Sequence, residues 1–258
     1  MSWALRRQLL YLLGLFAFGA LVVFAILYPT LNKEPTCFDN KKNGTETGLD
    51  CGGSCQRMCL DDTSAPKILW SRAFPVINDT HNLVAFIENQ NKDAGVAQVD
   101  YEFKVYDANN LIIGIRRGTT YIPPNQQFAI FESRFEAGQS TIKSVSFDFI
   151  GDIVWLKKSP IIQTLPIRAE QISMSEDLTS PSLEALIRND SIYDMPPFDV
   201  IAILYDAERN AITASKTRSE GLYSNTSSPV FFTWPQAFTQ NVATKDVLIQ
   251  INPFETEF

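Results

Sequence analysis

Residues 99–107 read VDYEFKVYD, a stretch in which apolar and polar side chains alternate. A period of two is expected of a β-strand that buries one face and exposes the other to water. Residues 107–110 (DANN) then supply turn residues, and a second strand-like stretch follows at 111–117. This order of strand, turn and strand predicts an antiparallel β-hairpin, the unit from which β-sandwiches are built.

The same pattern recurs about 100 residues later in the chain. Residues 83–89 (LVAFIEN) align with residues 183–189 (LEALIRN), and residues 103–108 (FKVYDA) align with residues 202–207 (AILYDA). So long a period indicates tandem domains rather than a solenoid. We therefore expect a mainly β protein with two tandem antiparallel β-sandwich domains of about seven strands each.

The boundaries of these domains follow from composition. We expect the first sandwich at residues 67–158 and the second at residues 159–258. Residues 60–67 are polar, contain a proline and form the linker before the first domain. The join between the domains, KKSP at residues 157–160, is short. The sequence therefore predicts that the two sandwiches lie end to end with limited freedom.

Residues 9–28 (LLYLLGLFAFGALVVFAILY) contain no charged side chain. At a rise of about 1.5 Å per residue, a helix of this length spans about 30 Å, which matches the hydrocarbon core of a bilayer. Arg6 and Arg7 precede the stretch, so residues 1–8 are expected in the cytoplasm and the later residues outside it. A cleaved signal peptide is the alternative, but its apolar core is shorter and ends at a small-residue site.

Charge and composition limit the functions of the exported part. Removing Arg6 and Arg7 from the 22 basic residues leaves 20 against 29 acidic ones, a net charge of −9. Such a surface repels phosphate backbones, so nucleic acid is not an expected partner. At 45% hydrophobic residues the chain can bury real cores.

The four cysteines are confined to residues 29–66, at Cys37, Cys51, Cys55 and Cys59. Outside the cytoplasm thiols oxidise, and a segment this short cannot form a hydrophobic core of its own. We expect a small knot with two disulfides, whose pairing the spacing leaves open. Structural zinc is the alternative, although no histidine lies nearby.

Residues 37–55 (CFDNKKNGTETGLDCGGSC) resemble a motif of exported bacterial surface proteins, C-x-D-x-x-x-N-G-x-E-T-G-x-D-C-G-G-x-C. The resemblance implies a module beside a membrane anchor or between domains and names no activity. Asp39, Asn43 and Asp50 also fall at ligand positions of a calcium loop, although Lys41 occupies a position where a ligand is expected. Alternatively, the Asn-Gly and Gly-Gly pairs simply supply the turns of a tight knot. We expect no cofactor, with calcium at these three residues as the alternative.

Residues 103–107 (FKVYD) and 202–206 (AILYD) resemble the FxLYD type of immunoglobulin-like or fibronectin-like domain. The first copy keeps the phenylalanine and has two prolines, at 123 and 124, before Phe128. The second copy has Ala202 in place of the aromatic residue. The resemblance implies a binding or spacer role rather than a reaction, and together with the anchor and the cysteine motif it is similar to envelope proteins of bacteria.

We expect no enzyme and assign no catalytic residue. His81 is the only histidine and stands in a polar loop, which favours a turn role over that of a general base. Asp107 and Asp206 stand where β-turns favour aspartate.

Aromatic residues near the C-terminus are the candidates for an interaction surface. In residues 230–234 (VFFTW) the neighbours Phe231 and Phe232 must point to opposite faces of a strand, so one of them leaves the core. With Trp234, they are expected either to cover the junction between the domains or to present a surface to a partner.

These observations favour a non-catalytic single-pass protein of the cell envelope. We expect the membrane to hold the N-terminal helix, and the two sandwiches to be displayed outside the cytoplasm to an envelope or surface protein. The first alternative is an accessory subunit of a membrane transport, secretion or pilus complex, in which the helix itself contacts partner helices. An extracytoplasmic hydrolase is the third.

Overall fold

The computed structural model describes residues 3–31, 36–158, 166–175, 177 and 179–255. The chain divides into two compact units, Met1–Ser54 and Cys55–Phe258. We describe each unit by itself. The protein is mostly β, with one long N-terminal helix and several antiparallel sheets, as the sequence predicts.

The first unit begins with a long helix, α1 (Trp3–Leu31). Within α1 the segment Arg6–Leu27 is long and apolar enough to cross a membrane. Its large side chains are exposed, from Leu9 at 49% to Leu27 at 48%. An apolar helix at the N-terminus meets the requirements of a membrane span and of a signal sequence alike.

Residues 36–54 complete the first unit as a series of turns. Gly52 and Gly53 both have positive φ angles, of 75° and 56°. A Cβ atom on Gly52 would lie 1.8 Å from the hydroxyl oxygen of Thr47, so only glycine fits there. All four cysteines are disulfide-bonded, which confirms the two predicted disulfides.

Module 1, defined here as residues 67–158, is a sandwich of two antiparallel sheets. One sheet has the order β1-β2-β5, and the other has the order β4-β3-β6 with β7 paired to β3. Leu83, Phe103 and Ile122 fill the core between these sheets and are 0% exposed. The strands are β1 (Lys67–Ile77), β2 (Thr80–Asn89), β3 (Ala94–Asp107), β4 (Ile112–Ile122), β5 (Gln126–Glu136), β6 (Ile142–Ile150) and β7 (Leu156–Lys157).

Module 2, defined here as residues 166–255, repeats this arrangement. Its sheets have the orders β12-β9-β8 and β11-β10-β13, and Leu183, Leu204 and Phe232 lie in the core between them. Its strands are β8 (Ile167–Met174), β9 (Ser182–Asn189), β10 (Phe198–Tyr205), β11 (Ala211–Ser219), β12 (Thr226–Thr233) and β13 (Thr244–Gln250).

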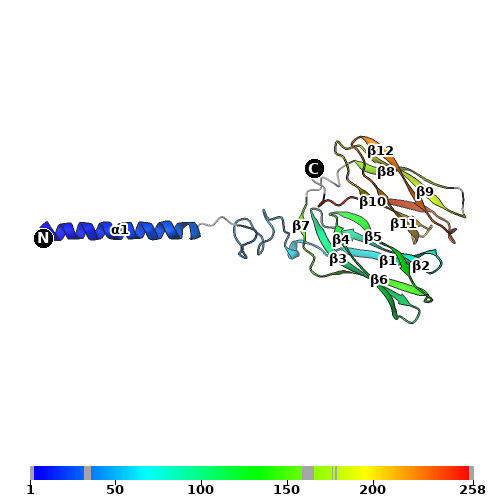
Figure 1. The fold of residues 1–258 in the computed structure, drawn as a ribbon, viewed down its shortest axis with the longest axis horizontal. Coiled ribbons are helices and arrows are strands. Elements are labelled where there is room, and N and C mark those ends of the chain that lie inside the picture. The colour runs from blue at the N-terminus through cyan, green and yellow to red at the C-terminus, as the bar shows by residue number, and fades with distance from the viewer. Residues whose placement is uncertain (1–2, 32–35, 159–165, 176, 178, 256–258) are drawn as a thin grey trace. The chain divides into compact units, whose positions relative to one another are not determined.

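The two modules lie against each other (Figure 1), and a third apolar layer of side chains joins their facing sheets. Val84 and Phe86 of β2 point away from the core of module 1 and pack with Ile201 and Ile203 of β10. As a result β2 and β10 are buried on both faces. The prediction that the sandwiches lie end to end is wrong, because these outward apolar side chains pack a sheet of module 1 face to face on a sheet of module 2.

Residue differences between the copies determine which faces dock. At the positions equivalent to Ile201 and Ile203, module 1 has Glu102 and Lys104. At the position equivalent to Val84, module 2 has the exposed Glu184. Each module therefore has one outer face that is apolar and docks, and one that carries charges and stays in water.

Candidate functional site: a cleft between the modules

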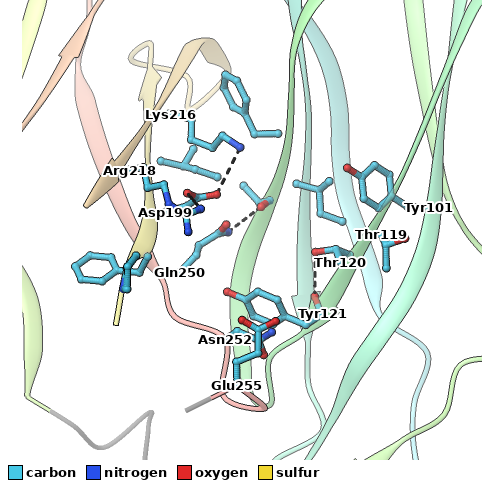
Figure 2. A pocket seen from close by; sticks show the side chains of 16 residues that line it. Tyr101, Thr119, Thr120, Tyr121, Asp199, Lys216, Arg218, Gln250, Asn252 and Glu255 are labelled. Carbon is cyan, nitrogen blue, oxygen red and sulfur yellow. Dashed lines mark hydrogen bonds and ion pairs between the residues drawn. The ribbon is translucent and has the colours of Figure 1, made fainter. Parts of the chain in front are cut away.

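A polar cleft of about 280 Å³ lies at one end of the third layer, between the two modules (Figure 2). Module 1 contributes Tyr101 of β3, the end of β4 and the middle of β5. Module 2 contributes the start of β10, the end of β11, the end of β13 and the segment that follows β13. The polar side chains of the cleft are Tyr101, Thr119, Thr120, Tyr121, Asp199, Lys216, Arg218, Gln250, Asn252 and Glu255.

Two cations and one carboxylate form one side of the cleft. Lys216 and Arg218 are two residues apart on β11, so both point to the same face of the sheet. Asp199 lies directly opposite Arg218 in the β10–β11 register, and each cation is 3.5 Å from one of its carboxylate oxygens. These two ion pairs are longer than the pair between Arg117 and Glu102 on module 1, in which the nitrogen and oxygen are 2.6 Å apart.

Contacts across the modules fix this side of the cleft. The Lys216 ammonium nitrogen lies 5.8 Å from the centre of the Phe131 ring, a cation–π distance. The side-chain amide of Gln250 donates a hydrogen bond of 2.7 Å to the Ala129 carbonyl oxygen. Elsewhere in the interface Arg72 donates to the Ala211 carbonyl oxygen at 2.8 Å. The cleft thus depends on the docking of the two modules.

Tyr121, Asn252 and Glu255 lie together at the lower end of the cleft in the view of Figure 2. Burial raises the pKa of the Tyr121 hydroxyl well above its ordinary value, and the negative charges of Asp199 and Glu255 raise it further. The hydroxyl therefore stays protonated and available as a donor. Asn252 accepts the Phe254 backbone N–H at 3.0 Å, which orders the turn that carries Glu255.

Comparisons with known proteins name no family for this chain. Neither the protein-family models nor the curated proteins gave a match. Among solved structures, the chain is similar to red sea bream transglutaminase, with 9% sequence identity and a TM-score of 0.23. The likeness covers 73% of this chain and 31% of that one, and at this TM-score it carries no argument about function.

The calcium candidates in the cysteine knot act as turn-forming residues. The Asp50 carboxylate accepts the backbone N–H groups of Asp39 and Asn40 at 3.0 and 2.9 Å. The Asn43 amide donates to the Asp39 carboxylate at 2.8 Å. Asp39 and Asp50 oxygens thus already accept hydrogen bonds from the knot itself, and calcium stays the alternative to the expectation of no cofactor.

The three aromatic candidates near the C-terminus separate in the structure. Phe232 and Trp234 are 1% and 7% exposed and belong to the core of module 2. Phe231 is 57% exposed and lies on the outer face of β12. Phe231 and Phe232 therefore do not cover the junction between the domains, whereas Trp234 lines a small pocket that also includes Pro75 and Val76 of module 1.

The single histidine and the two turn aspartates have structural partners. The His81 ring nitrogen Nδ1 lies 3.1 Å from the Asp79 carbonyl oxygen. Asp107 accepts the Leu111 backbone N–H at 2.8 Å, and Asp206 accepts that of Asn210 at 2.7 Å. These bonds are typical of side chains that close β-turns.

Sequence reasoning missed every residue of the cleft. Its side chains come from strands far apart in the chain, and only the docking of the modules brings them together. One signal was present in the sequence: the apolar runs LVAFI at 83–87 and VIAIL at 200–204 are too continuous for strands with one wet face.

Proposed function

We propose that this protein is a single-pass, non-catalytic membrane protein that holds two docked β-sandwiches outside the cytoplasm and binds a partner in the cleft between them. The partner is an envelope or surface component. The single observation that carries the proposal is a polar cleft built by both modules and fixed by contacts across them.

The membrane part of the proposal rests on α1 and on the cysteines. The apolar segment Arg6–Leu27 has the length of a span, and Arg6 and Arg7 at its start favour a cytoplasmic N-terminus. Disulfides persist in oxidising compartments, and all four cysteines are disulfide-bonded. Both features agree with export of everything after the helix.

The binding part rests on rigidity and polarity. Two sandwiches joined by a third apolar layer present one fixed surface, which lowers the ordering cost of binding a partner. Pockets with a few convergent polar groups at domain junctions are frequent ligand sites. The cleft has both properties.

Site-specific photocrosslinking on the full-length protein in its native membrane tests the proposal. A photoreactive residue at Thr119, in the cleft, should give a discrete adduct with a partner. The matched control is the same residue at Glu184, on the exposed outer face of β9. Equal labelling at both positions, or adducts at neither, would overturn the binding of an envelope or surface partner in the cleft.

A second candidate function uses the helix rather than the cleft. Gly19 and Ala20 leave a shallow apolar groove on α1, flanked by Leu12, Phe16 and Val23. Small residues let a partner helix approach closely, which favours an accessory subunit of a membrane complex. Replacing α1 by an unrelated span should abolish partner capture if this function is correct, and leave capture unchanged if the cleft is the site.

A further inference from the structure

We propose that the cleft recognises a free carboxylate group, which Lys216 and Arg218 bind in place of Asp199. The inference deepens the proposed function, on which it rests, by naming the chemistry of the ligand. It depends on the long ion pairs of Lys216 and Arg218 with Asp199, on the hydrogen-bonding groups of Tyr121 and Glu255, and on the volume of the cleft.

The cations are poised for exchange because Asp199 holds them loosely. Both distances to its carboxylate are 3.5 Å, longer than the 2.7 Å between Arg168 and Asp190 in the same module. The Arg218 side chain is 64% exposed, so an incoming anion reaches the guanidinium without a rearrangement of the strand. Two cations thus face one carboxylate here, and Glu255 is the second carboxylate of the cleft.

Two neighbouring cations stand out in an exported chain whose net charge is −9. An acidic surface discourages the indiscriminate capture of anions. A guanidinium beside an ammonium is a good receptor for a carboxylate, since charge-assisted hydrogen bonds are the strong ones. The arrangement therefore favours a small anion that fits the cleft over a large polyanion.

The residues at the other end of the cleft define the rest of the ligand. The Tyr121 hydroxyl is a donor, and the Glu255 carboxylate is an acceptor. A group that carries both N–H or O–H donors and oxygen acceptors beside its carboxylate satisfies both residues. About 280 Å³ holds one amino-acid residue or one monosaccharide unit. The C-terminal residue of a peptide and a sugar acid share this chemistry.

Calorimetric titration of the full-length protein in detergent tests the inference and separates the two sources. The probes are N-acetyl-dialanine with its C-terminal amide, and glucuronate with glucose. At least one acid should bind about tenfold more tightly than its uncharged counterpart. The acid that does so identifies the source. Equal affinity within both pairs, or no binding by any of the four probes, would overturn the inference.

Three variants make the test specific to the cleft. Lys216→Gln and Arg218→Gln should each weaken binding of the acid about tenfold. Asp199→Asn should strengthen it, because the internal competitor loses its charge. Arg209→Gln removes an exposed cation of the same module outside the cleft and should change nothing. Weaker binding in Asp199→Asn would contradict exchange, provided that its thermal unfolding matches that of the wild type.

The two proposals fail separately. Adducts at Thr119 without any preference for the acids would leave the cleft as a binding site and remove the carboxylate. A preference for an acid without adducts at Thr119 would support the carboxylate site and contradict the binding of an envelope or surface partner there.

Discussion

Asn89 and Asn189 occupy equivalent positions in the two modules, and each forms the same kind of hydrogen bonds to the loops of its own module. Each amide is buried, at 1% and 0% exposed, at the end of an inner strand. Each accepts a backbone N–H from two residues later, at 3.0 Å in both modules. Each also donates to loop carbonyl oxygens, those of Ala94 and Pro123 in module 1 and of Tyr193, Leu222 and Tyr223 in module 2.

Replacing either asparagine by alanine should destabilise its module by about 2–3 kcal/mol, because several buried backbone groups lose their partner at once. Urea denaturation monitored by tryptophan fluorescence measures the loss. Gln90→Ala, at an exposed neighbouring position, is the control and should stay within about 0.5 kcal/mol of the wild type. A similar small effect for Asn89→Ala would contradict the shared role.

Ile203→Lys should separate the modules, because it introduces into the third layer the residue that module 1 has at the equivalent position. Burying an unpaired ammonium costs about 3 kcal/mol or more, so the charge is expected to open the interface. Small-angle X-ray scattering should give a larger radius of gyration. The reciprocal change Lys104→Ile lies on a wet face and should leave the stack closed. An unchanged radius for Ile203→Lys would refute the assignment of this layer.

Acid should weaken module 1 through Glu102. Hydrogen bonds from Lys104 and Arg117 lower the pKa of the Glu102 carboxyl below its ordinary value. Because this pKa is lower in the folded protein than in the unfolded chain, the ionised carboxylate stabilises the fold. The stabilisation is complete above the pKa of the unfolded chain, about 4.3, and is lost as the pH falls through the pKa of the folded protein. The difference in Tm between the wild type and Glu102→Gln should therefore shrink from pH 7 to pH 3. A constant difference would argue against the ion pairs.

Mass spectrometry of the denatured protein tests the disulfides. Alkylation without reductant should leave the mass unchanged, and alkylation after reduction should add a group to each of the four cysteines. Peptide mapping of the unreduced digest would then assign the pairing. Labelling before reduction would indicate free thiols and argue against export.

The sequence predicted the strands, the duplication, the N-terminal helix and the disulfides, because each depends on residues close together in the chain. The alternation in residues 99–107 is one example, and it became β3 as expected. The docking of the modules was missed because Val84 and Phe86 were interpreted only as part of a strand, not as a second apolar face. The cleft was missed for a related reason: Tyr121 and Arg218 line one cleft only after docking.

The two sandwiches dock through faces that do not correspond. Module 1 uses its β1-β2-β5 sheet, whereas module 2 uses β11-β10-β13, the counterpart of β4-β3-β6. Such a head-to-tail contact has no closing symmetry, so a further copy of either module could in principle extend the series without end. Glu102 with Lys104 at one terminus of the series, and Glu184 with Arg188 at the other, act as polar caps like those that end repeat proteins. Charge on both outer layers thus disfavours the docking of a third such module on either face.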